Sequence, residues 1–292
     1  MPNLNLPKQV TIMDVSPRDG LQSYPVFVPT EKKIELINSL IAAGVQHIEA
    51  TSFVSPKWVP QMADAEQLLV AVSENAANHG VTLEALIPNE KGYDRAKATG
   101  LLKEIGFVVA ATESMNQKNV GMTVADSMKH FAAIAEKAKA DGVQVRGTIA
   151  VAFVCPYEGR VQNRQTIDIA DQLFKLGADE VCLGDTVGRA TPDQVYALFS
   201  ELKDRWPEKP LAGHFHDTHG MALANIFSAM QAGVDIFDSA VGNLGGCQFA
   251  KGSTGNVSTE SLVYMLNGMD IRTGIDFEKI SATAGVAKKL FS

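Results

Sequence analysis

Two histidines one residue apart give the sharpest chemical signal in the chain. The segment His214-Phe215-His216-Asp217 closes an apolar run that begins at residue 211. If this run is a β-strand, both imidazoles project from the same face, because alternate side chains of a strand share a face. Neighbouring imidazoles are a natural pair of metal ligands. The alternative is a pair of histidines that only form hydrogen bonds in a polar environment.

A carboxylate and a guanidinium follow the first apolar run of the chain. Pro17 and Gly20 predict a turn that displays Arg18 and Asp19 between them. The Asp19 carboxylate could bind a hard cation, and the Arg18 guanidinium could hold an oxyanion. The same two residues could also form a salt bridge without any catalytic duty.

Two further acids lie near the ends of other apolar runs. Glu49 lies in the run at 47–53, and Asp185 ends the run at 180–185. Burying a charged side chain is costly unless it is paired or binds a ligand. Acids, imidazoles and a guanidinium on several strand ends therefore predict one shared site.

A glycine-rich segment follows the last of these runs. Five of the 15 residues from 242 to 256 are glycine, which predicts a mobile lid or a backbone cradle for an anion. Cys247, in its middle, is either a catalytic thiol or an ordinary loop residue. Asn256 either caps the helix predicted at 258–266 or binds the metal.

These residues need a scaffold, and eight short apolar or β-branched runs alternate with amphipathic helical patterns. The predicted strands are Val10–Val15, His47–Phe53, Thr82–Ile87, Gly106–Ala111, Gln144–Phe153, Glu180–Asp185, Leu211–His216 and Ile236–Val241. The pattern predicts a (β/α)8 TIM barrel, in which the carboxyl ends of all the strands meet at one mouth. The alternative, a doubly wound open sheet, would favour a GxGxxG motif after the first strand, which this sequence lacks.

The helical patterns fall between the strands. They are Glu31–Ala43, Ala63–Asn78, Val124–Ala140, Gln165–Leu176, Pro192–Asp204 and Ala222–Ala232. Thr30 and Thr191 are the predicted caps of the helices that follow them, with Pro192 in the first helical position. We predict a single domain over 1–292, with the barrel at about 8–268 and a C-terminal helix at about 276–290.

The bulk composition narrows the class of protein. The chain has 292 residues, of which 46% are hydrophobic, and a formal net charge of −7. It contains no long block of one charge sign and no apolar run of membrane-spanning length, so we expect neither a nucleic-acid nor a membrane partner. The cysteines Cys155, Cys182 and Cys247 form no CxxC motif, and the first ten residues contain no apolar signal core. We therefore expect a cytoplasmic location.

Several stretches resemble the 3-hydroxy-3-methylglutaryl-CoA lyase family, within the metal-dependent barrel lyases and Claisen-type synthases that share a DRE-like first-strand motif. They cover residues 17–22, 48–62, 155–159, 183–186, 214–218 and 245–247. The run IEATSFVSPKWVPQM at 48–62 is nearly diagnostic of the lyase branch. The HFHDT run at 214–218 is typical of the whole group.

The resemblance implies a role for each candidate residue. Its metal ligands fall on Asp19, His214, His216 and Asn256, and this donor set suits Mg²⁺ or Mn²⁺. Its catalytic and supporting residues fall on Arg18, Cys247, Glu49, Asp185 and His214. We expect Arg18, Gln22 and Ser52 to contact an acyl-CoA substrate. Homo-oligomerisation is left open.

The implied reaction is a retro-Claisen cleavage of 3-hydroxy-3-methylglutaryl-CoA to acetyl-CoA and acetoacetate, as in leucine breakdown. Arg18 would stabilise the enolate oxyanion of the departing acetyl-CoA, and Cys247 would help to protonate the enolate. Either His214 or Asp185 would remove the proton from the substrate hydroxyl.

The sequence departs from the family pattern at Ser23-Tyr24, where Asn-Glu is usual, at Gln248-Phe249 in the glycine-rich segment, and at His219. These departures bear on the substituent at C3 of the substrate, which could be longer than methyl. A Claisen-type synthase or a hydroxy-oxoacid aldolase on the same barrel is the first alternative. A barrel that only binds an acyl-CoA is the second.

Overall fold

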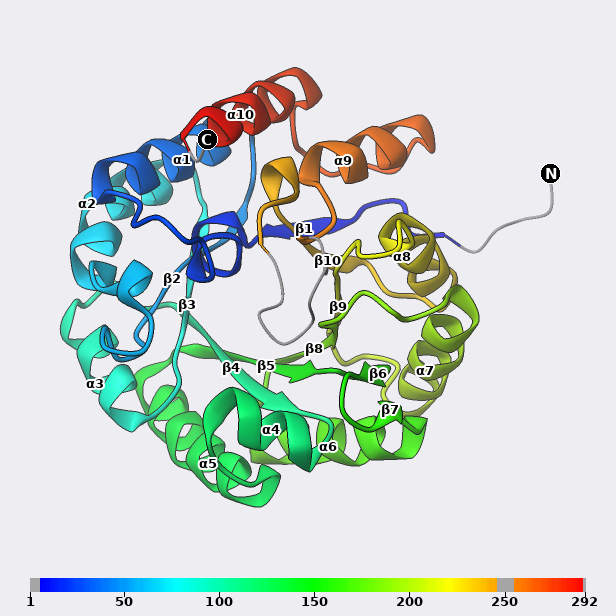
Figure 1. Ribbon diagram of the computed structural model, residues 1–292. Helices are drawn as coiled ribbons and strands as arrows, with labels where there is room; N and C mark the ends of the chain where they lie inside the picture. The colour runs from blue at the N-terminus through cyan, green and yellow to red at the C-terminus, as the bar shows by residue number, and fades with distance from the viewer. Residues whose placement is uncertain (1–5, 246–254, 291–292) are drawn as a thin grey trace.

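The computed structural model describes residues 6–245 and 255–290, and it is a closed barrel of eight parallel strands (Figure 1). Around the barrel the strand order is β1-β10-β9-β8-β5-β4-β3-β2. The strands are β1 Thr11–Asp14, β2 His47–Ser52, β3 Thr82–Leu86, β4 Glu104–Ala110, β5 Gln144–Ala150, β8 Glu180–Asp185, β9 Leu211–Phe215 and β10 Ile236–Ser239. The predicted TIM barrel is confirmed, and each predicted strand overlaps an observed one.

The strand that was predicted to run to Phe153 ends earlier. The strand β5 stops at Ala150 because Val151 has a φ of 50°, in the left-handed region that a β-branched residue rarely adopts. The amide of Val151 then donates to Thr186 Oγ1 at 2.9 Å. A small antiparallel hairpin follows, with β6 at Val154–Cys155 and β7 at Gly159–Arg160, and the sequence pattern did not predict it.

Helices form a ring outside the barrel (Figure 1). They are α1 Thr30–Ala42, α2 Ala65–Asn78, α3 Glu90–Ala98, α4 Glu113–Val120, α5 Val124–Asp141, α6 Asn163–Leu176, α7 Pro192–Arg205, α8 Ala222–Gln231, α9 Thr259–Gly268 and α10 Phe277–Leu290. The sequence analysis missed α3 and α4. Both are short and mostly polar, and α4 buries only Met115 and Asn116, so neither shows a clear apolar stripe.

The predicted helix caps have mixed outcomes. Thr191 is the N-cap of α7 and Pro192 takes the first helical position, as predicted. Thr30 was wrong as a cap, because α1 begins at Thr30 itself and its hydroxyl donates to Asp64 at 2.7 Å. Asn256 was also considered as a cap, but Ser258 fills that place by accepting the amide of Ser261 at 3.0 Å. Asn256 is therefore available for another role.

The hydrophobic core lies between the barrel and its ring of helices. Buried residues of the strands, such as Ile48 and Ile105, pack against helix residues such as Leu40 and Phe131. The C-terminal α10 contacts α1 and α9. This packing leaves the polar side chains of the strands to face inward, toward the barrel axis and its mouth. Within the described ranges, no helix combines the length and the apolar character needed to cross a membrane.

Candidate metal centre

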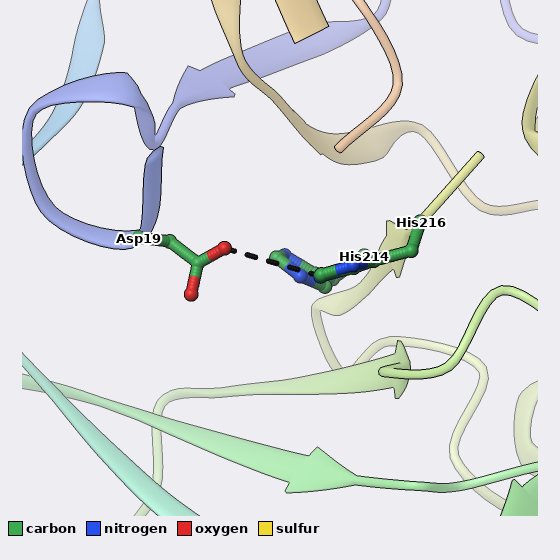
Figure 2. Close-up of side chains that lie close together, drawn as sticks. All are labelled: Asp19, His214 and His216. Atoms are coloured by element: carbon green, nitrogen blue, oxygen red, sulfur yellow. Dashed lines mark ion pairs between the residues drawn. The ribbon is translucent and has the colours of Figure 1, made fainter. Parts of the chain in front are cut away.

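Asp19, His214 and His216 meet at the carboxyl ends of the strands (Figure 2). One potential ligand atom from each side chain lies within 4.8 Å of those of the other two. His214 lies in β9 and His216 directly follows it, and their imidazole centroids are 5.2 Å apart. His216 Nε2 lies 3.9 Å from Asp19 Oδ2. The predicted convergence of these three residues is found in the structure.

A single π-helical turn, Ser16–Gly20, positions Asp19 and Arg18 directly after β1. The expected turn at Pro17 and Gly20 is thus wider than a β-turn, with the amide of Gly20 donating to the carbonyl of Val15 at 3.1 Å. A side chain at Gly20 would place its Cβ 2.9 Å from the Cβ of Leu244, so the close approach of these segments requires glycine. π-Helical turns are frequent at functional sites.

Asn256 joins the site from the far end of the chain. Its Nδ2 donates to Asp19 Oδ2 at 2.8 Å and to the carbonyl of Leu244 at 3.1 Å. Its Oδ1 is buried and has no hydrogen-bond partner within the part of the chain that the structure describes. A buried amide oxygen without a partner is costly, and a cation would satisfy it. Asn256, the residue predicted as a fourth ligand, therefore lies in hydrogen-bond contact with Asp19 of the cluster.

The four donors fit a divalent metal. Two imidazole nitrogens, one carboxylate and one amide oxygen form a mixed donor set of the kind that binds divalent cations. Burial raises the pKa of Asp19, but Arg18, the two histidines and the Asn256 hydrogen bond outweigh it and lower the pKa to about 2. The carboxylate is thus ionised and able to bind a cation.

Arg18 lies beside this cluster and is held by two acids. Its Nε is 2.7 Å from Glu49 Oε1, and its Nη1 donates to Asp19 Oδ1 at 2.9 Å. Burial of Arg18 would lower its pKa, yet the charges of Glu49 and Asp19 raise it, so the guanidinium stays charged. Gln22 also donates to Asp19 Oδ1, at 3.1 Å, which places this predicted substrate contact next to a metal ligand.

Asp185, at the end of β8, lies in the same mouth but is tied to the backbone. Its two carboxylate oxygens accept the amides of Arg189 and Ala190, each at 3.0 Å. Burial raises its pKa to about 6, despite these hydrogen bonds. Asp185 therefore shapes the loop after β8 and still titrates near neutral pH.

The remaining predicted residues differ in how far the structure describes them. Ser52 is buried at the end of β2, where its hydroxyl donates to the carbonyl of Leu86 at 3.2 Å and accepts the amide of Val54 at 3.3 Å. These bonds keep the hydroxyl within the loop after β2. Cys247 lies outside the described residues, as does most of the glycine-rich segment.

Two charged residues inside the barrel were not predicted from the sequence: Asp238, which contacts His214, and Arg146, which contacts Asp238. Asp238 on β10 accepts a hydrogen bond from His214 Nδ1 at 3.0 Å and pairs with Arg146 on β5 at 2.6 Å. Burial lowers the pKa of His214, but the hydrogen bond and the charge of Asp238 raise it by more. The pKa therefore lies above the ordinary value for histidine. An acid in the middle of the otherwise apolar run IFDS was a usable signal, of the same kind as Glu49.

Comparisons with known proteins agree with this geometry. The HMGL-like family model matches residues 9–286. A 3-hydroxy-3-isohexenylglutaryl-CoA/hydroxymethylglutaryl-CoA lyase of Pseudomonas aeruginosa is 43% identical over 277 residues, which is 95% of this chain and 91% of the relative.

Two solved structures have the same architecture. The crystal structure of hydroxymethylglutaryl-CoA lyase from Pseudomonas aeruginosa superposes with a TM-score of 0.94 at 42% identity, covering 99% of this chain and 95% of that one. A lyase from Acinetobacter baumannii, solved with coenzyme A and 3-methylmalate, gives 0.88 at 38% identity over 100% and 93% of the two chains. Because the family model matches residues 9–286 and these relatives cover nearly the whole chain, the chain belongs to the HMGL-like family, that of the hydroxymethylglutaryl-CoA lyases.

Proposed function

We propose that this protein is a divalent-metal-dependent lyase that cleaves 3-hydroxy-3-methylglutaryl-CoA, or a close 3-alkyl analogue, to acetyl-CoA and a 3-oxo acid. The observation that carries the proposal is the meeting of Asp19, His214 and His216 beside a charged arginine. A metal site next to an oxyanion-binding group is the arrangement that a retro-Claisen cleavage needs. The relatives named as lyases of such thioesters support the same substrate class.

Asp19, His214, His216 and Asn256 would hold the metal, whose charge supplies Lewis-acid polarisation of the substrate's oxygen atoms. Asn256 fits because its amide oxygen is buried and lacks a hydrogen-bond partner among the described residues. We propose Mg²⁺ or Mn²⁺ as the ion, since half of the ligand atoms are oxygens of hard donors.

Arg18 would stabilise the charge that develops on the thioester oxygen as the C2–C3 bond breaks. Its Nε pairs with Glu49 and one Nη with Asp19, so the plane of the guanidinium is fixed before substrate binds. Preorganised donors of this kind stabilise a transition state by a few kcal/mol, because they need no reorganisation during the reaction. Glu49 acts by orienting the arginine.

Asp185 is the better candidate for the base that removes the hydroxyl proton. Both ring nitrogens of His214 have other duties, because Nδ1 bonds to Asp238 and Nε2 is left to face the metal. Asp185 has a pKa of about 6, so it is ionised at neutral pH and yet basic enough to take a proton. Cys247, from the glycine-rich segment, would then supply the proton that converts the enolate to acetyl-CoA.

The size of the C3 substituent and the cellular setting are finer parts of the proposal. Ser23-Tyr24, His219 and Gln248-Phe249 depart from the family pattern, so the proposal includes a C3 substituent longer than methyl. Cys155 and Cys182 are free thiols, which supports a reducing cytoplasm. Leucine breakdown would be the pathway if methyl is the substituent.

A coupled assay tests the proposal directly. Purified protein is stripped of metal with a chelator, and acetyl-CoA release from 3-hydroxy-3-methylglutaryl-CoA is followed before and after Mg²⁺ or Mn²⁺ is added. We expect turnover only with metal, and a panel of 3-alkyl analogues run beside it ranks the substituents. Metal-independent turnover would contradict the metal site, and no release from any analogue would contradict the lyase.

A further inference from the structure

A line of buried and partly buried charged residues runs from the barrel interior to His214 of the metal site. Its members come from four different strands: Glu180 on β8, Arg146 on β5, Asp238 on β10 and His214 on β9. Arg146 is 2% exposed and Asp238 3% exposed, so neither pair is a surface salt bridge. Burying two opposite charges stabilises a protein little by itself, which makes another reason for their presence worth seeking.

Each contact along this line is short and directional. Arg146 Nε lies 2.5 Å from Glu180 Oε1, and its Nη2 donates to Asp238 Oδ1 at 2.6 Å. Its Nη1 donates to Asp238 Oδ2 at 3.2 Å, so the arginine grips the carboxylate with two parallel bonds. The same Oδ2 lies 3.0 Å from His214 Nδ1. The bidentate grip fixes the position of the carboxylate that faces the imidazole.

This geometry determines what His214 can do at its other nitrogen. An ionised carboxylate only accepts hydrogen bonds, so His214 must donate its Nδ1–H to Asp238. A neutral imidazole with the proton on Nδ1 keeps a lone pair on Nε2, which leaves that nitrogen able to bind a cation. Ligand histidines in metalloproteins are commonly fixed in this manner by a carboxylate.

We propose that Asp238, held by Arg146, is a positioning residue that fixes the ring orientation and the tautomer of His214 for metal binding. Neither residue is one of the four proposed ligands, and both act through the histidine. The inference rests on the proposed metal site. Its test must therefore separate a failure of the relay, the chain of contacts from Arg146 through Asp238 to His214, from a failure of the metal site itself.

The first measurement needs no variant at the relay. Nitrogen-15 NMR of the metal-free wild-type protein, recorded in a pH series up to the point where the ring signals stop shifting, reports which nitrogen of neutral His214 carries the proton. A His214→Gln spectrum assigns the signal. We expect the proton on Nδ1. A proton on Nε2 would overturn the proposal, whether or not the protein binds metal.

The second measurement is the affinity for Mn²⁺ alone, from the loss of the free-ion EPR signal during titration. Tight binding to wild type tests the metal site itself. We expect Asp238→Asn to weaken binding by about 10–100-fold, because an amide can rotate and no longer enforces the donor role of Nδ1–H. Arg146→Lys keeps the charge but loses the two-bond grip, so we expect a smaller loss of about 3–10-fold.

A buried ion pair elsewhere in the chain gives the matched control. Lys33 and Asp64 pair at 2.8 Å in a buried contact between α1 and the start of α2, and neither contacts the metal site. Asp64→Asn should lower thermal stability as the relay variants do, while Mn²⁺ affinity stays within about twofold of wild type. Unchanged Mn²⁺ affinity in folded Asp238→Asn or Arg146→Lys would overturn the proposal. If neither variant folds, the NMR measurement of the His214 tautomer in the wild-type protein decides whether the proposal holds.

Discussion

Two groups of buried polar and charged residues lie inside this barrel, and they differ in how their charges are balanced. The mouth cluster comprises Arg18, Asp19, His214, His216 and Asn256, and its donors converge on one point. The interior cluster comprises Glu84, Glu104, Arg146 and Asp238, and acids outnumber bases in it. A bound cation and a substrate oxyanion would account for the charges of the mouth cluster. In the interior cluster Arg146 pairs with Asp238, which leaves the burial of Glu84 unexplained by pairing.

Glu84 marks the difference most clearly. It is 1% exposed on β3, and its Oε2 has no hydrogen-bond partner within the described ranges. Burial raises its pKa well above the ordinary value, and the charges of Glu49 and Glu104 act in the same direction against the opposing effect of Arg146. In contrast, Asp19 in the mouth is surrounded by positive partners and keeps a pKa of about 2. The balance between burial and the nearby charges therefore sets the direction in which the pKa of each acid shifts.

Removing a proposed ligand from the mouth cluster should have the largest effect. Asp19→Ala should lower turnover of 3-hydroxy-3-methylglutaryl-CoA by about 10³-fold or more, because Lewis-acid stabilisation of several kcal/mol is lost with the metal. Mn²⁺ titration should show the matching loss of affinity. Normal metal binding by this variant would separate Asp19 from the site.

Arg18→Gln tests whether the mouth cluster contains two functions or one. We expect kcat to fall by about 10²–10³-fold, the usual cost of removing one oxyanion donor, while Mn²⁺ affinity changes only a few-fold. Steady-state kinetics and metal titration on the same preparation give both values. Equal losses of affinity and rate would mean that the arginine serves only to hold Asp19.

Asp185→Asn tests the assignment of the base. With a pKa of about 6, Asp185 is ionised above that pH, so wild-type kcat/KM should fall as the pH drops below about 6. The amide cannot accept the proton, so we expect a loss of about 10²-fold and a profile without the acidic limb. An acidic limb retained in the variant would assign that titration to another group.

Much of this arrangement could be predicted because it depends on local pattern. Alternation along a strand places His214 and His216 on one face, and closure of a parallel barrel brings Asp19 to the same mouth. The contact between Arg146 and Asp238 could not be predicted in the same way. Strands β5 and β10 are separated by β8 and β9 around the barrel, so their side chains meet across its interior. Such neighbours depend on strand register and tilt, which local periodicity does not encode.

The tie between Asn256 and Asp19 shows the same limit. The two residues are 237 positions apart, and the structure joins them through a hydrogen bond of 2.8 Å. Residue patterns left Asn256 as either a helix cap or a ligand, and only the observed cap at Ser258 removes the first choice. Only the resemblance to known lyases favoured the ligand role of Asn256 over the cap, because the residue pattern is compatible with both.

The smallest expected effect concerns the interior cluster and is measured in stability. The raised pKa of Glu84 means that the folded state keeps a proton that the unfolded chain releases, so stability falls as pH rises above the ordinary value of 4.5. Glu84→Gln removes this titration. We expect the variant to be more stable than wild type at pH 8, by about 1–3 kcal/mol, the scale of a buried polar group left unsatisfied. At pH 4 the two proteins should differ little.

Urea unfolding at both pH values measures this difference, with Glu66→Gln as the control. Glu66 is half-exposed and pairs with Arg95 at 2.8 Å, so its loss should cost less than about 1 kcal/mol at either pH. Gly106 leaves room for the Glu84 side chain, because a Cβ at residue 106 would lie 2.6 Å from Glu84 Oε1. The nearly isosteric glutamine should fit the same space. A less stable Glu84→Gln at pH 8 would mean that the carboxylate is charged and useful, and that the interior cluster follows the same rule as the mouth cluster.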